Sequence, residues 1–352
     1  MSEILGLGIT HYPPLAGRDE NMAGILRTTL EHHSIPAGLK QPSAWPPLMQ
    51  EEWGADRGIA AAARHRQALL SGFTRIRSAL DAFRPDFVLI WSDDQYENFT
   101  EDIVPPFCVL AYESIEARPW KLRHAGMPGS DNVWGEAEDL VYPIPCHREA
   151  AKFLVSGLIT QGFDVSYSYK PLHADGVGHA FLNSVAFLDY DRTGFNHRVV
   201  CFSVNCYGRR VIVEQGNLAR FTELPPEKLD PPSPSPQRCF DLGRAAARVL
   251  RDSPYRVALM ASSSWSHAFL HEKAWRLYPD VESDRAFYDA LKTGDYLKWC
   301  ETSLEALEQS GQTEMLNWFC LIGAMAELQR KPAWTDFVES YVFNSNKCFA
   351  IF

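Results

Sequence analysis

The sequence lacks the features that mark several classes of protein. Its 352 residues contain no run of about 18 apolar residues, which a membrane-spanning helix requires. The eight cysteines form no CxxC pair, a pattern typical of reduced thiols rather than of a disulfide framework or a structural zinc site. The first residues, MSEILGLGITHYPPL, have neither the basic segment nor the long apolar segment of a signal peptide. We therefore expect a cytoplasmic protein with no membrane partner.

Basic residues are also in short supply. The chain has 34 Lys and Arg against 44 Asp and Glu, a formal net charge of −10. Nucleic acids bind to clustered Lys and Arg, so no nucleic-acid partner is expected. Hydrophobic residues make up 46% of the chain and charged residues 22%, as in ordinary folded proteins, and this excludes extensive disorder.

Several common catalytic motifs are missing as well. No GxGxxG or Walker A pattern follows an expected strand, so nucleotide binding has no fingerprint. The serines of ASSSWSHAF are not part of a G-x-S-x-G motif, which argues against a serine hydrolase. His267 and His271 form an HxxxH pattern without the glutamate of a zinc-protease helix.

Short apolar strands alternate with helices along most of the chain. This alternation predicts an α/β fold, a single domain over residues 1–352 whose sheet is buried under helices on both faces. Two segments, 21–53 and the proline-rich 208–236, are expected as excursions from this domain. Strands are expected at 4–10, 87–91, 164–169, 198–204 and 255–261, and helices at 56–83, 147–160, 241–251, 284–292, 296–308 and 313–329.

Polar side chains follow all five expected strands. In open α/β sheets, ligands bind beyond the carboxyl ends of the strands. Three of the five ends carry histidine, and imidazole with carboxylate is a ligand set for Zn, Fe or Mn as well as for acid–base chemistry. A lone histidine at such a place is usually structural, but several at one edge indicate a site. The candidates are His11, Asp93, Asp94, Gln95, His173, Asp175, His179, Asn205, Tyr207 and His267.

A collinear series of motifs runs through nearly the whole chain: GITHYPPL, FVLIWSDDQYENFTEDIVPPF, HADGVGHAF, FSVNCYG, QRCFDLGRAAARVL, ASSSWSHAFL and VESDRAFYDAL. Through them the chain resembles the class III extradiol ring-cleavage dioxygenases, which include the catalytic subunit of protocatechuate 4,5-dioxygenase. The resemblance implies a central mixed sheet flanked by helices on both faces. It also implies an enzyme that opens a small catechol-like or aminophenol-like ring, inserting both atoms of O2, at an Fe(II) held by two histidines and one glutamate.

The resemblance also assigns metal ligands. The family's first histidine matches His11, and its glutamate falls on Glu282 in VESDRAF. The second histidine has no counterpart, because the alignment places Gln95 there. Gln95 could coordinate through its amide oxygen, or Asp93 or Asp94 could substitute and favour a harder ion. Mn, Zn or no metal therefore remain alternatives to Fe(II), and DDQYENF could also be a polar capping loop.

Further site residues follow from the same resemblance. His267 corresponds to the histidine that acts as acid and base, and His179 to a histidine that contacts the substrate. Asn205 and Tyr207 are candidate substrate contacts, as is Asp94. A carboxylated ring would need a basic residue in the pocket, for which Arg148 and Arg209 are candidates.

Three hypotheses follow for the function. The leading one is the Fe(II)-dependent ring-cleavage dioxygenase. The second keeps the pocket but has another metal or none, and uses His267 for acid–base C–C hydrolysis or lyase chemistry. The third is a non-catalytic partner subunit or binding module. Because members of the family usually form dimers, a homodimer is expected.

Overall fold

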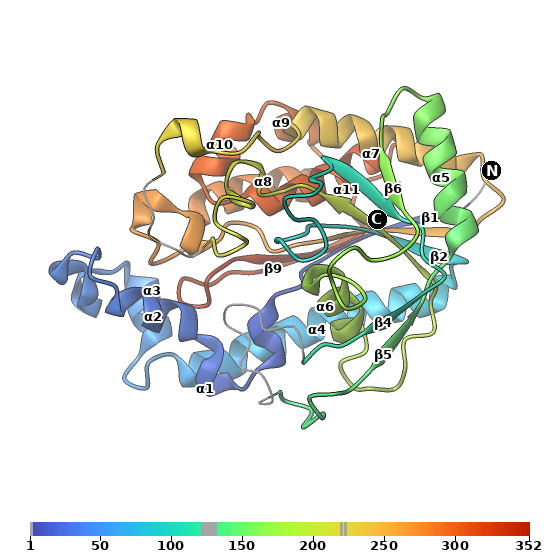
Figure 1. Ribbon diagram of the computed structural model, residues 1–352. Helices are drawn as coiled ribbons and strands as arrows, with labels where there is room; N and C mark the ends of the chain where they lie inside the picture. The colour runs from blue at the N-terminus through green and yellow to red at the C-terminus, as the bar shows by residue number, and fades with distance from the viewer. Residues whose placement is uncertain (1–2, 121–131, 219–220, 222–223) are drawn as a thin grey trace.

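The computed structural model describes residues 3–120, 132–218, 221 and 224–352. Across them runs one sheet of eight strands in the order β6-β3-β7-β2-β8-β1-β10-β9, and β4 and β5 form a separate pair (Figure 1). The strands are β1 (Ile4–Ile9), β2 (Phe87–Ser92), β3 (Phe107–Leu110), β4 (Ser114–Ala117), β5 (Tyr142–Pro145), β6 (Ser166–Ser168), β7 (Val199–Val204), β8 (Val257–Ser262), β9 (Trp334–Val338) and β10 (Lys347–Ile351).

The centre of the sheet is parallel, and an antiparallel pair flanks it on each side. Strands β7, β2, β8 and β1 pair in parallel, while β3 runs antiparallel to β7, and β10 antiparallel to β1. Every residue of β2, β7 and β8 is buried, which explains their continuous apolar sequences. The predicted mixed sheet is confirmed, and the parallel centre brings the carboxyl ends of four strands to one edge.

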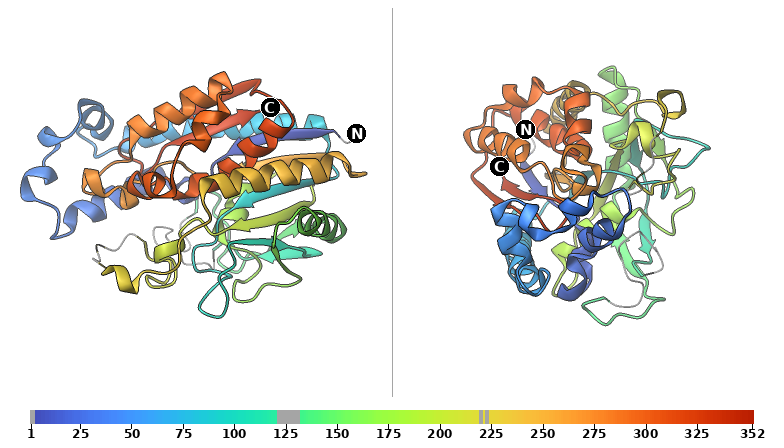
Figure 2. Two further views of the ribbon diagram at one scale, coloured as in Figure 1. Left: turned by 90° about the horizontal axis from the view of Figure 1, so that it is seen from above. Right: turned by 90° about the vertical axis from the view of Figure 1, so that its left-hand side faces the viewer.

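Helices cover both faces of this sheet. Helices α5, α7 and α11 pack on one face and α4 and α6 on the other, as the views in Figures 1 and 2 show. The predicted α/β class is therefore confirmed. The helices are α1 (Asp19–Met22), α2 (Gly24–Glu31), α3 (Pro47–Trp53), α4 (Ile59–Phe83), α5 (Arg148–Thr160), α6 (His179–Leu188), α7 (Pro236–Arg251), α8 (Val281–Thr293), α9 (Tyr296–Cys300), α10 (Leu304–Gln309) and α11 (Leu316–Glu327).

The sequence-based assignment missed β3, β4, β5 and the short helices α1 to α3, and it was also wrong in the following places. The chain does not stay helical to its end, because β9 and β10 complete one margin of the sheet. The expected helix 296–308 is divided into α9 and α10, since Ser303 caps α10 by accepting a hydrogen bond from the Ala306 amide. His179 lies in the first turn of α6 rather than in a loop. This helix is buried on all sides, so its sequence lacks the amphipathic periodicity that would predict a helix.

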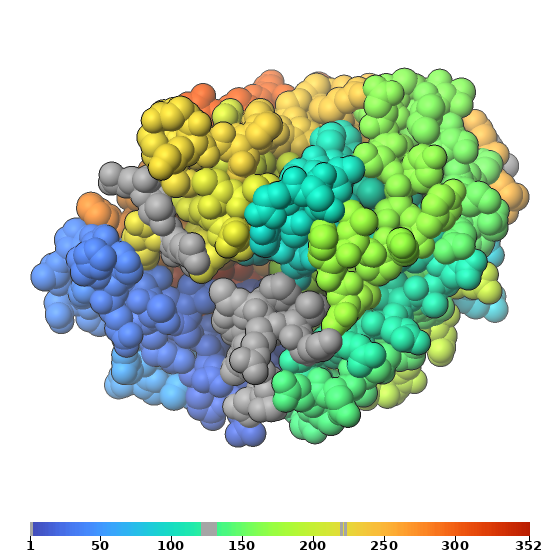
Figure 3. All heavy atoms as spheres, in the orientation of Figure 1, coloured from blue at the N-terminus to red at the C-terminus, as the bar shows by residue number. Residues whose placement is uncertain are grey.

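The two excursions lie where the chain leaves the sheet. Helices α2 and α3 stand at the lower left of Figure 1, beyond the strands. Segment 208–236, of which residues 219–220 and 222–223 lie outside the described residues, has only two 3-10 turns, at Gly208–Arg210 and Pro226–Lys228. Figure 3 shows this segment in yellow beside the teal loop that follows β2. The Gln95 amide joins the two by donating a 2.6 Å hydrogen bond to the Gly216 carbonyl.

Two expectations about the chain as a whole can be compared with this fold. All eight cysteines are free thiols, as their spacing predicted. Among the described residues, no helix has the length and apolar character needed to cross a bilayer.

Candidate metal centre

The carboxyl ends of β1 and β2 bring two of the predicted side chains together. The Nε2 atom of His11 lies 3.7 Å from Oδ1 of Asp93 and 3.6 Å from Oε2 of Glu314, a residue in the turn before α11. His179, the first residue of α6, completes a group in which His11, Asp93 and His179 each offer a ligand atom within 4.8 Å of the others. We call His11, Asp93, His179, His267 and Glu314 the buried cluster; all five are buried.

A carbonyl group fixes the orientation of His11. Its Nδ1 lies 3.1 Å from the carbonyl oxygen of Ser262, at the end of β8. A carbonyl can only accept, so Nδ1 carries the proton and Nε2 presents a lone pair to Asp93 and Glu314. Burial, with His179 and His267 nearby, lowers the pKa of His11 well below its ordinary value. His11 is therefore a neutral imidazole with a free ligand atom.

Glu97 fixes both the backbone and the imidazole of His179. One carboxylate oxygen of Glu97 accepts the backbone amide of His179 at 2.8 Å, and the other lies 2.9 Å from the imidazole Nδ1. Burial alone would lower the pKa of His179, but the Glu97 carboxylate raises it to about 9. Gly178 makes the contact possible, since a Cβ there would lie 2.6 Å from Glu97 Oε2. A carboxylate behind an imidazole is the usual support of a metal-binding histidine.

The two carboxylates of the cluster are incompletely satisfied. Among the described residues, Oδ2 of Asp93 and Oε2 of Glu314 are buried without a hydrogen-bond partner. Burial raises the pKa of Asp93 to about 7, and burial together with Asp93 raises the pKa of Glu314 well above its ordinary value. Unpaired buried carboxylate oxygens are costly, and a divalent cation would satisfy both. The donor set of imidazole and carboxylate thus fits a metal ion.

Two residues contact Glu314 on its other side. The Nε2 atom of His267 lies 3.2 Å from Oε1 of Glu314, and the Tyr207 hydroxyl donates a hydrogen bond to that same oxygen. Burial and Lys347 lower the pKa of His267 to about 3, so this imidazole is neutral at pH 7. Its Nδ1 has no hydrogen-bond partner among the residues described. His267 and Tyr207 therefore place a base and a hydroxyl beside the candidate metal ligand.

Two residues that the resemblance nominated as ligands lie outside the cluster. The side-chain amide of Gln95 points to Gly216 in the 208–236 segment. Glu282 lies in the first turn of α8 with an exposed side chain, near Arg285 and Tyr341. Glu282 does not meet the histidines in the structure, because the apolar face of α8 is buried and leaves this carboxylate in solvent. In the structure the carboxyl groups nearest His11 Nε2 are instead those of Asp93 and Glu314.

Other candidates from the sequence have local roles. Asp94 accepts hydrogen bonds from the backbone amides of residues 97–99, which is the capping alternative for DDQYENF. Asn205 caps its own loop by accepting the Gly208 amide at 3.0 Å. His173 lies at the surface, 3.0 Å from Asp102. Arg148 pairs with Glu113 and donates to the Ala111 carbonyl.

Sequence reasoning missed Glu314 and Glu97. Glu314 was expected inside a helix over 313–329, and no strand end marks it. Its position depends on α11 packing closely on β1, where a Cβ on Gly8 would lie 2.1 Å from the Trp318 ring. The available signal was the pair of glycines in β1, Gly6 and Gly8, which indicates a close approach but does not say of which element.

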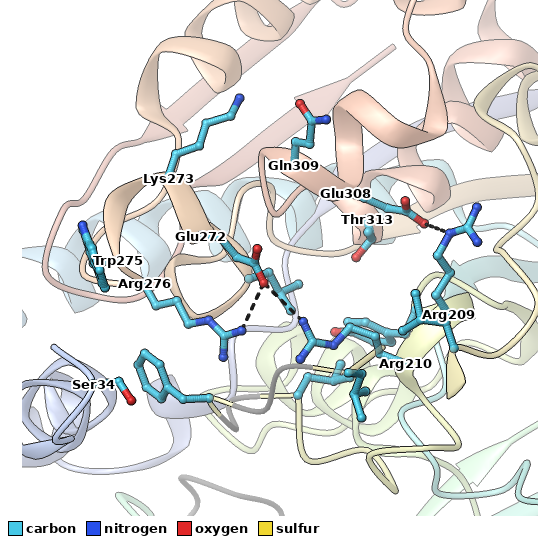
Figure 4. Close-up of a pocket in the computed structure, with 16 residues that line it drawn as sticks. Ser34, Arg209, Arg210, Glu272, Lys273, Trp275, Arg276, Glu308, Gln309 and Thr313 are labelled. Atoms are coloured by element: carbon cyan, nitrogen blue, oxygen red, sulfur yellow. Dashed lines mark hydrogen bonds and ion pairs between the residues drawn. The ribbon is translucent and has the colours of Figure 1, made fainter. Parts of the chain in front are cut away.

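A cavity of about 690 Å³ adjoins the cluster. Tyr207 and Thr313, the neighbour of Glu314, lie in its wall, and so does Arg209, the sequence candidate for carboxylate binding. Figure 4 shows its charged residues. The lining residues are Ser34, Tyr207, Arg209, Arg210, Leu218, Phe221, Leu224, Leu229, Leu270, Glu272, Lys273, Trp275, Arg276, Glu308, Gln309 and Thr313.

The mixed α/β sheet and the imidazole–carboxylate cluster at its edge define a protein with a candidate metal site. Comparison with known families shows which family this part of the chain is similar to. Residues 223–350 match the family described as the catalytic LigB subunit of aromatic ring-opening dioxygenase. This match confirms the resemblance to class III extradiol dioxygenases.

Curated relatives carry related names. The chain is 25% identical over 193 residues to a 2,3-dihydroxyphenylpropionate/2,3-dihydroxicinnamic acid 1,2-dioxygenase of Burkholderia vietnamiensis, covering 54% of this chain and 46% of the relative. A protein of Pseudomonas putida with the same activity in its name is 24% identical over 194 residues, with 54% and 46% covered. One of Rhodococcus rhodochrous is 24% identical over 283 residues, covering 74% of this chain and 82% of the relative. The chain thus spans about half the length of the first two relatives.

Proposed function

We propose that this protein is an extradiol ring-cleavage dioxygenase that opens a catechol-like or aminophenol-like ring with O2. The names of the relatives and of the matching family support the reaction class. The observation that carries the proposal is the buried cluster, in which the carboxyl groups of Asp93 and Glu314 lie 3.7 Å and 3.6 Å from His11 Nε2, and each keeps one oxygen without a hydrogen-bond partner among the described residues. Neither acid–base hydrolysis nor a purely structural role requires two buried, unpaired carboxylates.

The metal in this proposal is Fe(II), held by His11, Glu314 and Asp93, with His179 as a further ligand. This replaces the set of His11, Gln95 and Glu282 inferred from the resemblance. Iron, when bound, would supply the electron transfer between the aromatic ring and O2. Because Asp93 stands where a second histidine was expected, the set is richer in carboxylate and would also accept a harder ion such as Mn.

His267 would move the proton. Its neutral imidazole has an Nδ1 that no described residue binds, and this atom can accept the proton of a substrate hydroxyl as the ring binds and return it later. The Tyr207 hydroxyl holds Glu314 in place. His179, oriented by Glu97, faces His11 with the two ring centres 5.4 Å apart, so its second nitrogen can donate to a substrate oxygen when it does not bind the metal.

The proposal also covers the location, domain organisation and oligomeric state of the enzyme. We place it in the cytoplasm, as one catalytic domain with excursions at 21–53 and 208–236, and as a homodimer. Size-exclusion chromatography with light scattering tests the oligomeric state, and a monomer would contradict that part alone.

The central experiment measures oxygen uptake by protein loaded with Fe(II) without air, on a panel of catechols and aminophenols. We expect uptake, a ring-opened product, and loss of at least about 100-fold in turnover for His267→Ala with metal content retained. An iron-loaded protein that consumes no oxygen on any ring would reject the proposal. Cleavage of a C–C bond without oxygen would then favour the hydrolase or lyase hypothesis, and binding without turnover the partner-subunit hypothesis.

A further inference from the structure

The cavity beside the buried cluster contains two guanidinium groups that converge on one carboxylate. Nη2 of Arg276 lies 3.3 Å and Nη1 of Arg210 3.5 Å from the same oxygen, Oε1 of Glu272 (Figure 4). Glu272 belongs to a 3-10 turn, and its side chain is 71% exposed. Glu214 binds the Nε and Nη2 atoms of Arg210, at 3.2 Å and 2.6 Å, and leaves Nη1 directed to Glu272. A carboxylate thus already lies between the two guanidinium groups, on an exposed side chain that can rotate into solvent.

Arg276 is held in place by its surroundings. Its side chain is buried, and its guanidinium lies 4.7 Å from the ring centre of Phe221, which stacks on His32. A buried cation requires an anion close by, and Arg is well suited to bind carboxylates with its planar set of donors. The guanidinium of Arg276, held against the ring of Phe221, can therefore bind a carboxylate in this cavity.

The backbone that presents Arg276 is strained. Trp275 and Arg276 are consecutive residues with φ of +54° and +59°, in the left-handed region that side chains other than glycine rarely adopt. Such strain tends to be kept where it positions functional groups. Here it directs both Trp275 and Arg276 to the lining of one cavity.

Charge and size point to the kind of ligand. The cavity is lined by four basic and two acidic side chains, in a protein whose net charge is −10. Its volume of about 690 Å³ is in the range of sites for drug-sized ligands, and far exceeds the roughly 150 Å³ that accommodate a single benzene ring. The cavity reaches Tyr207 and Thr313, which border Glu314. A ligand can therefore extend from the cluster to the arginines.

We propose that Arg210 and Arg276 bind the terminal carboxylate of an elongated aromatic acid, which takes the place of Glu272, while the aromatic end lies toward Tyr207. The identity of the reacting ring rests on the proposed function; the acid site does not. These two arginines then select substrates whose acidic side chain is long, because a short one leaves them paired with Glu272.

The test is direct binding of acids that carry no ring hydroxyls, measured by calorimetry on the full chain. We expect affinity to rise from phenylpropionate through phenylpentanoate to phenyloctanoate, and phenyloctanol to bind at least about 10-fold more weakly than the matching acid. Arg276→Gln should weaken phenyloctanoate binding about 10- to 100-fold, and Arg210→Gln similarly. Equal binding of acid and alcohol would overturn the proposal.

A second variant guards against a folding defect in the arginine variants. Glu272→Gln removes the competing carboxylate, so we expect phenyloctanoate to bind about 3- to 10-fold more tightly. Glu308 lines the same cavity but pairs with Arg209. Glu308→Gln therefore removes the same charge without freeing Arg210 or Arg276, and should change the affinity for phenyloctanoate less than about 2-fold. If Glu272→Gln bound phenyloctanoate equally or more weakly, the replacement of Glu272 by the ligand carboxylate would be contradicted. Because no oxygen chemistry is measured, this outcome is separate from failure of the dioxygenase assay.

Discussion

In the buried cluster, the carboxyl groups of Asp93 and Glu314 lie beside the imidazole of His11, and each keeps one oxygen without a partner among the described residues. In the neighbouring cavity, Arg210 and Arg276 share the carboxylate of Glu272. The first region has buried carboxyl oxygens that a cation would satisfy, and the second has two guanidinium groups beside an exposed carboxylate that can move away. The difference shows that the two regions are suited to different ligands: a metal ion in one, an acidic group in the other.

Of the substitutions that test this difference between the two regions, loss of Glu314 should have the largest effect on metal affinity. Glu314→Gln removes a candidate metal ligand that also contacts His11, His267 and Tyr207. We expect the affinity for Fe(II) to fall at least about 100-fold and ring cleavage to fall with it. Chelator competition and oxygen uptake measure both. Glu308→Gln is the control, since it removes a carboxylate in the cavity, and an equal loss in the two variants would contradict the role of Glu314.

Asp93→Asn should have the next largest effect. The substitution keeps the size of the side chain and removes its charge from a fully buried position. We expect metal affinity to fall about 10- to 100-fold, with binding of phenyloctanoate unchanged because the cavity is untouched. If metal binding were retained at full strength, Asp93 would be a structural carboxylate whose pKa stays raised by burial.

The third prediction concerns Glu97 and His179 in metal-free protein. Glu97→Gln removes the carboxylate that raises the pKa of His179 most and leaves only Asp93 and Glu314 to oppose burial, so this pKa should fall from about 9, as measured by NMR. A raised histidine pKa stabilises the fold fully below pH 6.5, and this stabilisation is lost as the pH rises through about 9. The melting temperature of the native protein should therefore exceed that of the variant at pH 6 and approach it near pH 10. A constant difference would contradict the ion pair.

The smallest effects are expected at the two residues outside the cluster. Gln95→His and Glu282→Gln should each change Fe(II) affinity less than about 2-fold, because Gln95 binds the Gly216 carbonyl and Glu282 is exposed. Chelator competition on both variants measures this. Tighter iron binding by Gln95→His would mean that this side chain can turn toward the metal, and would restore the ligand set that the resemblance implied.

Part of the site was predictable because it follows a local rule. Apolar runs marked β1, β2 and β8, and polar residues directly after them were expected at one edge of the sheet. His11, Asp93 and His267 are found there. Nothing comparable marked β10, because the partner that makes it a strand, β1, is at the other end of the chain.

The carboxylates were the part that local rules could not supply. Glu282 had a family-like spacing, yet α8 buries Phe287 and turns Glu282 to solvent. Glu314 had no pattern of its own, and reaches His11 only because α11 packs against β1 at Gly8. Spacing along a helix gives the face of a residue but not which side of the protein that face meets.

By itself the sequence determined the α/β class, the buried parallel strands and the histidines at their ends, since each depends on residues close together in the chain. The tertiary structure decided which carboxylates join those histidines and which arginines meet at Glu272. Charged side chains come together through the packing of distant helices and turns, and their energies depend on burial and on neighbours that no local pattern encodes.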